Sequence, residues 1–228
     1  MNSFINMNLF VVLPYVMVFT FLLVSIRRYV YRPFTYSTLS SQFLDRRSHF
    51  WALVPFHYGL ILVLTGHLLA FLIPRSILAW NRVPLRLYAL EITGLALAML
   101  TLVGLLVGVV RRVKSPRLRV VTTPLDWVIF ALLLSQVITG IGVAVMHPWG
   151  SSWFAAAMSP YLWSLVTFRP NLNYVSDLPW MIKTHIVNAY VLLLIFPFSR
   201  LAHVLVAPIP YLWRRPQVVR WYSADGAK

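Results

Sequence analysis

The chain has 228 residues, of which 60% are apolar and 11% charged, and its formal net charge is +15. Soluble domains are closer to half apolar and a quarter charged, so this composition excludes an ordinary soluble protein. The sequence contains no cysteine, which excludes disulfides, thiol redox chemistry and iron–sulfur clusters ligated by this chain.

Five apolar runs follow one another along the chain, each of about 20 residues, the length that crosses a bilayer. They cover about residues 4–26, 50–73, 87–110, 125–146 and 180–206. The first run has no basic segment before it, so we expect a retained helix rather than a cleaved signal peptide. No stretch outside the runs is long enough to bury a core of its own. We therefore expect an all-α fold, with residues 1–228 forming a single transmembrane domain of five helices.

The basic residues lie at the ends of the apolar runs and alternate between the two sides of the expected membrane. The first and third linkers and the C-terminal tail are rich in arginine, whereas the long fourth linker holds only Arg169. This alternation predicts that the N-terminus lies outside and the C-terminus in the cytoplasm. The same placement suits anionic lipid head groups better than a nucleic acid.

Four histidines lie inside the apolar runs: His57 and His67 in the second, His185 and His203 in the fifth. Histidine is rare at membrane depth, because its polar ring there needs a partner or a ligand. The expected topology places His67 opposite His185 on the outer side and His57 opposite His203 on the inner side. Two pairs at two depths are what two bis-histidine haems require, and neutral imidazole is a common metal ligand.

The spacing of these histidines does not fit two straight helices. A helix rises ~15 Å between His57 and His67 but ~27 Å between His185 and His203. A tilted helix or a kink at Pro197 would absorb the difference. The alternatives are histidines that bond to their neighbours, or a proton relay. A metal-ion transporter is disfavoured, because the runs offer almost no carboxylates and no thiols.

Two further histidines, His49 and His147, fall at the ends of apolar runs and are left out of the ligand set. Short motifs surround the other four. They are Ser40-Ser41-Gln42, Leu44-Asp45-Arg46, Phe56-His57, Gly66-His67, Ser115-Pro116-Arg117 leading to Thr122-Thr123, Val166-Thr167-Phe168, and Phe196-Pro197-Phe198-Ser199-Arg200-Leu201 before His203. With these motifs in this order, the sequence resembles the membrane cytochrome b (gamma) subunit of respiratory nitrate reductase along nearly its whole length.

The resemblance implies two haem b groups, with His67 and His185 as ligands of the outer one and His57 and His203 as ligands of the inner one. It implies that quinol, either ubiquinol or menaquinol, is oxidised near the outer face. Electrons would pass to an iron–sulfur beta subunit and a molybdenum-containing catalytic alpha subunit on the cytoplasmic side. It further implies a multi-pass protein of a bacterial or archaeal inner membrane, with a role in anaerobic respiration and nitrate assimilation.

Near the outer face, Arg86 occupies a position at which the family has a lysine of the quinol site. Arginine keeps the positive charge and the donors but cannot lose its proton, so a role that requires deprotonation is in doubt. We expect Arg86, Gly66 and His67 to border the quinol. Glu91 is a candidate acceptor for a quinol proton, and the alternative is an interfacial carboxylate that reaches water.

Near the inner face, Arg112 is a candidate for binding a haem propionate, because the arginine fork matches a carboxylate. Arg111 and Arg200 are candidates of the same kind. Positive-inside topology explains these arginines equally well without a haem.

Two other functions stay open. One is a cytochrome b subunit of another respiratory reductase, of the heterodisulfide- or sulfite-reductase type, and the other is a haem-free transporter with a histidine relay. The basic and aromatic linker 28–50 and the tail after residue 206 are expected docking surfaces for cytoplasmic subunits, with lipid contact as the alternative.

Overall fold

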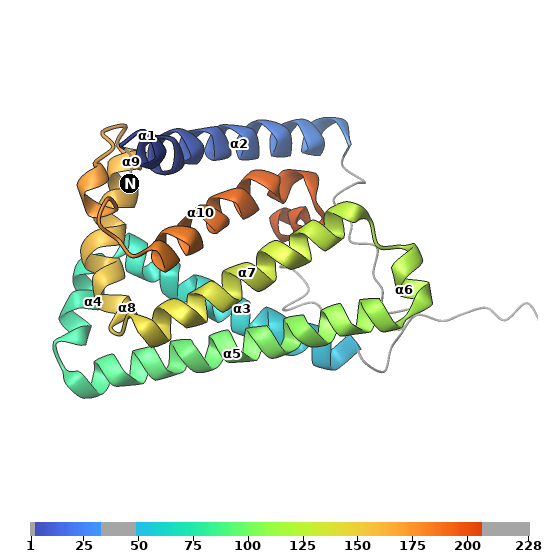
Figure 1. The fold of residues 1–228 in the computed structure, drawn as a ribbon, viewed down its shortest axis with the longest axis horizontal. Coiled ribbons are helices and arrows are strands. Elements are labelled where there is room, and N and C mark those ends of the chain that lie inside the picture. The colour runs from blue at the N-terminus through green and yellow to red at the C-terminus, as the bar shows by residue number, and fades with distance from the viewer. Residues whose placement is uncertain (1–2, 33–48, 207–228) are drawn as a thin grey trace, which may run out of the picture.

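The computed structural model describes residues 3–32 and 49–206, and these ranges are almost entirely helical (Figure 1). The elements in chain order are α1 Ser3–Met7, η1 Asn8–Val12, α2 Leu13–Tyr31, α3 His49–Leu72, α4 Pro74–Asn81, α5 Pro84–Lys114, α6 Pro116–Val120, α7 Pro124–Met146, α8 Gly150–Trp153, η4 Phe154–Met158, α9 Ser159–Val166, η5 Leu172–Tyr174, α10 Trp180–Ile195, η6 Phe196–Phe198 and η7 Arg200–Val206. The motifs at 40–42 and 44–46, most of the linker 28–50 and the tail after residue 206 lie outside the described residues.

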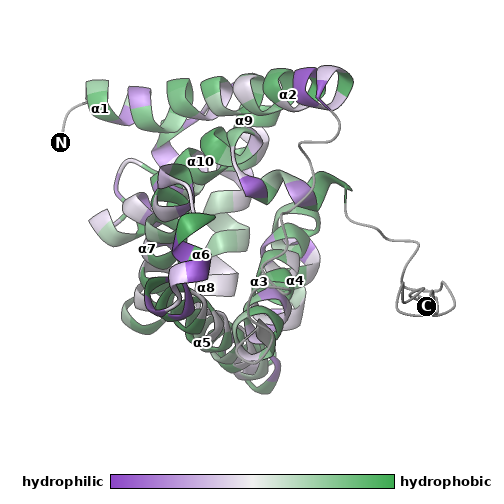
Figure 2. Cartoon of the chain, turned by 90° about the vertical axis from the view of Figure 1, so that its right-hand side faces the viewer, coloured by the Kyte–Doolittle hydropathy of each residue, from purple (hydrophilic) through white to green (hydrophobic). Residues whose placement is uncertain are grey.

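Five segments are long and apolar enough to cross a membrane, so the expected all-α fold with five spanning helices is confirmed. They are Phe4–Tyr31, Phe50–Leu72, Pro84–Lys114, Pro124–Met146 and Trp180–Phe198. The first and third are longer than predicted, because the arginines at 27–28 and 111–112 continue their helices instead of ending them. Helix α5 ends only where Ser115 turns extended, at φ −93° and ψ 113°, before Pro116. Many large apolar side chains of these helices are exposed, as a lipid environment requires, and Figure 2 shows that the long helices are mostly apolar.

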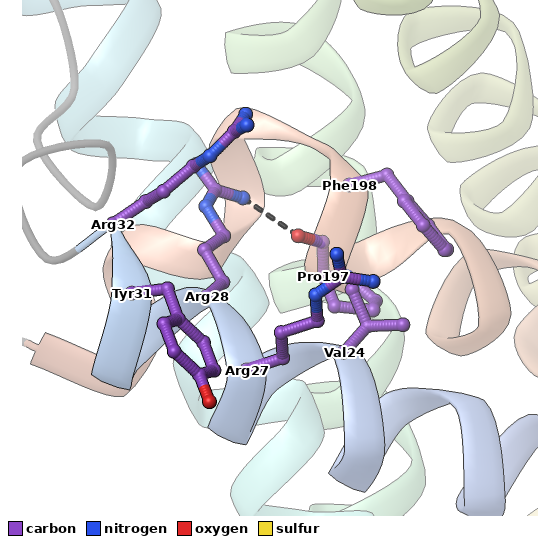
Figure 3. A pocket seen from close by; sticks show the side chains of 7 residues that line it. All are labelled: Val24, Arg27, Arg28, Tyr31, Arg32, Pro197 and Phe198. Carbon is purple, nitrogen blue, oxygen red and sulfur yellow. Dashed lines mark hydrogen bonds between the residues drawn. The ribbon is translucent and has the colours of Figure 1, made fainter.

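The fifth run is not one helix: the kink at Pro197 is confirmed, and the spanning segment ends at Phe198 instead of near residue 206. Helix α10 ends at Ile195, and Ser199 is extended, at φ −100° and ψ 178°, before η7 begins. Proline breaks the ladder because it has no N–H and its ring clashes with the carbonyl four residues earlier. Arg28 Nη1 donates hydrogen bonds to the freed carbonyls of Pro197 (2.6 Å) and Ser199 (3.0 Å). Figure 3 shows the first of these bonds beside a pocket between α2 and η6.

In the described part of the chain, the connections that follow α3, α5 and α7 contain short helices, which the sequence did not indicate. Helices α4, α8 and α9 gather at one end of the bundle, the α8 end, and α6 lies at the other, the α6 end (Figure 1). Helices α4, α5, α6 and α7 each have proline in the first turn, where the missing N–H costs no bond.

A cluster of buried residues lies where α2, α9 and α10 meet, and a tyrosine is at its centre. The hydroxyl of Tyr161, which is fully buried, donates to the Phe10 carbonyl at 2.6 Å and accepts from Tyr190 at 3.2 Å. Phe10 lies in the π-helical turn η1, a geometry that changes the usual carbonyl pairing. Burial raises the pKa of Tyr161 above its usual value. The hydroxyl therefore stays protonated at all ordinary pH values and keeps its hydrogen bond to the Phe10 carbonyl.

Helices α3 and α5 approach each other closely at two glycines. A Cβ at Gly104 would lie 2.4 Å from the Phe56 backbone nitrogen, and one at Gly59 would lie 2.7 Å from the Leu97 carbonyl oxygen. Small residues at such crossings let two membrane helices pack backbone to backbone. This contact fixes α3, and therefore the position of His57, which follows Phe56.

We expect Gly104→Ala to destabilise the protein by about 1–3 kcal/mol, because the added methyl group must push α3 away from α5. Thermal unfolding of the purified protein in detergent measures the loss. Gly94→Ala in the same helix is the matched control, since a Cβ there meets no atom within 4 Å. Equal midpoints for the two variants would contradict the close approach.

Candidate functional site: two histidine pairs

One of the two expected histidine pairs is brought together. The rings of His57, on α3, and His203, on η7, have centroids 6.4 Å apart and planes inclined at 66°. Two imidazoles on opposite sides of one metal, with metal–nitrogen bonds of about 2.0 Å, place their centroids about 6.3 Å apart. The break after α10 makes this approach possible, because η7 turns away from the axis of α10.

The hydrogen bonds of this pair leave the same nitrogen available on each ring. His57 Nδ1 bonds the Leu53 carbonyl at 2.8 Å, and His203 Nδ1 bonds the Arg200 carbonyl at 2.7 Å. A carbonyl can only accept, so each Nδ1 carries the proton and each Nε2 keeps its lone pair. An Nδ1–H held by a carbonyl is the usual support of a metal-bound histidine.

His67, ten residues after His57 on α3, has the same arrangement. Its Nδ1 bonds the Val63 carbonyl at 2.8 Å, and its ring lies edge-on to Phe154, with centroids 5.3 Å apart. The side chain is exposed, and a Cβ at the preceding Gly66 would meet no atom within 4 Å. The face of α3 around His67 therefore has room for a planar group.

His185, on α10, lies in a different setting. Its Nδ1 is 3.0 Å from the Thr139 hydroxyl, and its Nε2 is 3.2 Å from the Gln136 amide nitrogen. The ring packs against Gly140 of α7, where a Cβ would be 2.9 Å from the ring carbon Cε1. No ring contact joins His185 to His67 within residues 3–32 and 49–206, so the outer pairing stays a prediction.

The chemistry of this donor set suits haem better than a free ion. In the described part of the chain, no three His, Cys, Asp or Glu side chains are grouped closely enough to hold a metal ion. Haem brings its own four nitrogens and needs only two axial ligands, which a pair of neutral imidazoles supplies.

The arginines near the inner pair bond other parts of the protein. Arg112 Nη1 donates to Thr122 Oγ1 at 2.9 Å, and its guanidinium lies over the Phe130 ring at 5.3 Å. Arg200 donates to the Val121 carbonyl at 2.8 Å and pairs with Asp126 at 3.2 Å. Because the carbonyl of Arg200 also holds His203, the Arg200–Asp126 pair anchors the segment that carries an inner-pair histidine.

Asp126, in the first turn of α7, has two roles in this group. Its carboxylate accepts from the Thr123 backbone at 2.8 Å and closes a capping box at the start of α7. The spacing of Thr123 and Asp126 across Pro124 is the sequence signal for such a cap. Its second bond, to Arg200, has no local signal.

Two charged residues at the α8 end, Arg86 and Glu91, have partners within the protein. Arg86 is exposed in the first turn of α5 with its guanidinium 5.1 Å from the Trp80 ring centre. Glu91 accepts from the Ser151 backbone (2.9 Å) and hydroxyl (2.6 Å), which ties α5 to α8. Glu91 is therefore bonded within the protein and does not simply reach out to water.

Three polar residues around His185 were not singled out from the sequence: Gln136 and Thr139, which contact its ring, and Asn188, which bonds Gln136. They lie inside apolar runs and carry no charge, so a search for titratable or ligating groups passes over them. Their spacing is nevertheless a signal, because Gln136–Thr139 and His185–Asn188 are each three residues apart and share a helix face.

Comparison with known proteins adds to this geometry. A family model described as "Nitrate reductase gamma subunit" matches residues 6–222. The chain is 33% identical to the respiratory nitrate reductase 1 gamma chain of Escherichia coli (strain K12) over 223 residues, 96% of this chain and 98% of that one. It is 28% identical to the nitrate reductase gamma chain of Bacillus subtilis (strain 168) over 92% of this chain and 95% of that one. Five apolar helices and this match together make the chain a multi-pass membrane subunit of a nitrate reductase complex, and it belongs to the nitrate reductase gamma subunit family.

Proposed function

We propose that this chain is a dihaem cytochrome b subunit that oxidises quinol near the outer face and passes electrons to the cytoplasmic subunits of a respiratory nitrate reductase. The observation that carries this proposal is the His57–His203 pair, with centroids 6.4 Å apart and both Nδ1 atoms held by carbonyls. His67 and His185 are the proposed ligands of the second haem. Bound haem would supply one-electron redox chemistry at each site.

The charge distribution supports a direction for electron flow. The α6 end carries a run of basic residues that suits the cytoplasmic side: Arg111, Arg112, Lys114, Arg117 and Arg119. The N-terminus and the α8 end then face outward, and the inner pair lies nearer the cytoplasm. We propose that the iron–sulfur beta subunit and the molybdenum alpha subunit dock at the α6 end, in the inner membrane of a bacterium or archaeon. Relatives named as respiratory favour respiration over nitrate assimilation.

Quinol is proposed to bind at the α8 end, beside Gly66, His67 and Arg86. Gly66 leaves space next to the exposed His67 ring, and the permanently charged guanidinium of Arg86 offers N–H donors to a quinol oxygen. Because arginine does not lose its proton, Arg86 binds and orients quinol but does not accept the two protons that oxidation releases. Arg112 is proposed to bind a haem propionate through the guanidinium N–H groups that do not bond Thr122.

The histidine pairing is tested by single substitutions. His57→Ala and His203→Ala should lose the same haem, and His67→Ala and His185→Ala the other, because each haem needs both axial ligands. Redox-titrated absorption spectra of the purified complexes distinguish the two haems. His147→Ala, at the end of α7, is the control and should keep both. If His57→Ala and His203→Ala lost different haems, the pairing would be wrong.

The quinol site is tested by Arg86→Ala, which should raise the KM for quinol about tenfold through loss of a charge-assisted hydrogen bond. Nitrate reduction driven by a soluble dye that reduces the partner subunits directly should not change. Arg82→Ala, at the same end, is the control. An unchanged KM in Arg86→Ala would exclude the residue from the site.

The anchor of His203 is tested by Asp126→Asn, which removes the charge that pairs with Arg200. We expect a loss of about 1–3 kcal/mol in stability, since the carboxylate is buried and the arginine partly exposed. The inner haem should be lost on heating before the outer one, as followed by its absorption. Asp177→Asn makes the same change at an exposed carboxylate and should have no effect. Simultaneous loss of both haems would count against a local anchor.

A further inference from the structure

A small polar network surrounds His185 inside the apolar bundle. Asn188 Nδ2 donates to Gln136 Oε1 at 2.6 Å and to the Leu132 carbonyl at 3.0 Å. The Gln136 amide nitrogen lies 3.2 Å from His185 Nε2, and the Thr139 hydroxyl lies 3.0 Å from His185 Nδ1. Thus α7 and α10 meet here through side chains that bond one another.

The direction of each bond follows from what each group can donate. Asn188 donates to the oxygen of Gln136, so the nitrogen of that amide faces His185 and donates to Nε2. The Thr139 hydroxyl is 2.6 Å from the Ser135 carbonyl, which can only accept, so its one proton is used there. The hydroxyl must therefore accept from His185, which places the ring proton on Nδ1 and the lone pair on Nε2.

His185 differs in this respect from the other three histidines. His57, His67 and His203 each bond a carbonyl in their own helical segment, three or four residues earlier. The Nδ1 atom of His185 instead bonds a side chain of a different helix. A hydroxyl that is already donating is the only acceptor found for this Nδ1 within the described ranges.

We propose that Thr139 is a positioning residue for His185, fixing its tautomer and setting how strongly its Nε2 donates to iron. This inference rests on the proposed function, in which Nε2 of His185 would bind the outer haem iron in place of the Gln136 amide. An acceptor on Nδ1–H makes the imidazole a more basic ligand, which stabilises oxidised iron. Without the acceptor, the potential of the outer haem rises.

The test is Thr139→Val, which keeps the shape of the side chain and removes the acceptor. We expect the ratio of reduced to oxidised outer haem at a fixed solution potential to rise about tenfold, which is about 59 mV for one electron. Potentiometric titration of the intact complex, followed by absorption and by electron paramagnetic resonance, measures both haems. The inner haem should keep its potential, and Thr139→Ser should restore that of the outer haem.

Thr184→Val is the matched control. Thr184 precedes His185 in the chain, but its hydroxyl donates to the Trp180 carbonyl and should leave the potential unchanged. Loss of the outer haem alone in Thr139→Val, reversed in Thr139→Ser, also supports the proposal. An unchanged outer potential with two haems present overturns it, as does an equal change at both haems or loss of both. Absence of haem from the unmodified complex overturns the proposed function itself.

Discussion

An imidazole ring inside an apolar helix bundle needs a partner for each of its nitrogens. This requirement determines how the four histidines of the proposed haem sites are oriented. Three of the four histidines satisfy Nδ1 with a carbonyl of their own segment. That bond leaves Nε2 directed away from the backbone, where a ligand can use it. The fourth, His185, is satisfied by side chains of α7, so its setting depends on residues that can be substituted.

The break in the fifth apolar run is what joins the inner pair. A straight helix would carry His203 ~27 Å from His185 along the axis of α10, whereas His57 lies only ~15 Å from His67 along α3. Pro197 ends the helix, Ser199 turns the chain, and Arg28 bonds the carbonyls that the break exposes. The Arg200–Asp126 pair then fastens η7 to the start of α7. Local helix loss is therefore the feature that brings the rings of His57 and His203 to a centroid separation of 6.4 Å.

Sequence reasoning predicted the parts of this structure that depend on hydropathy and on single-residue chemistry. The five spans follow from apolar runs, and the four histidines follow from their rarity at membrane depth. The unequal spacing of His57–His67 and His185–His203 indicated that one helix is kinked or tilted, and the kink at Pro197 agrees with this. The short helices of the α8 end were missed because local caps and tertiary contacts, rather than hydropathy, set such turns. Thr139 and Gln136 were missed because their roles come from contact with another helix.

The central claim is that the histidine pairs hold haem, and the haem content of the purified full-length chain with its partner subunits tests it most directly. The account predicts about two b haems per copy of this chain, with separate midpoint potentials. A preparation that is folded and complete but contains no haem would contradict it, and the histidines would then have to serve as hydrogen-bonded or proton-carrying groups instead.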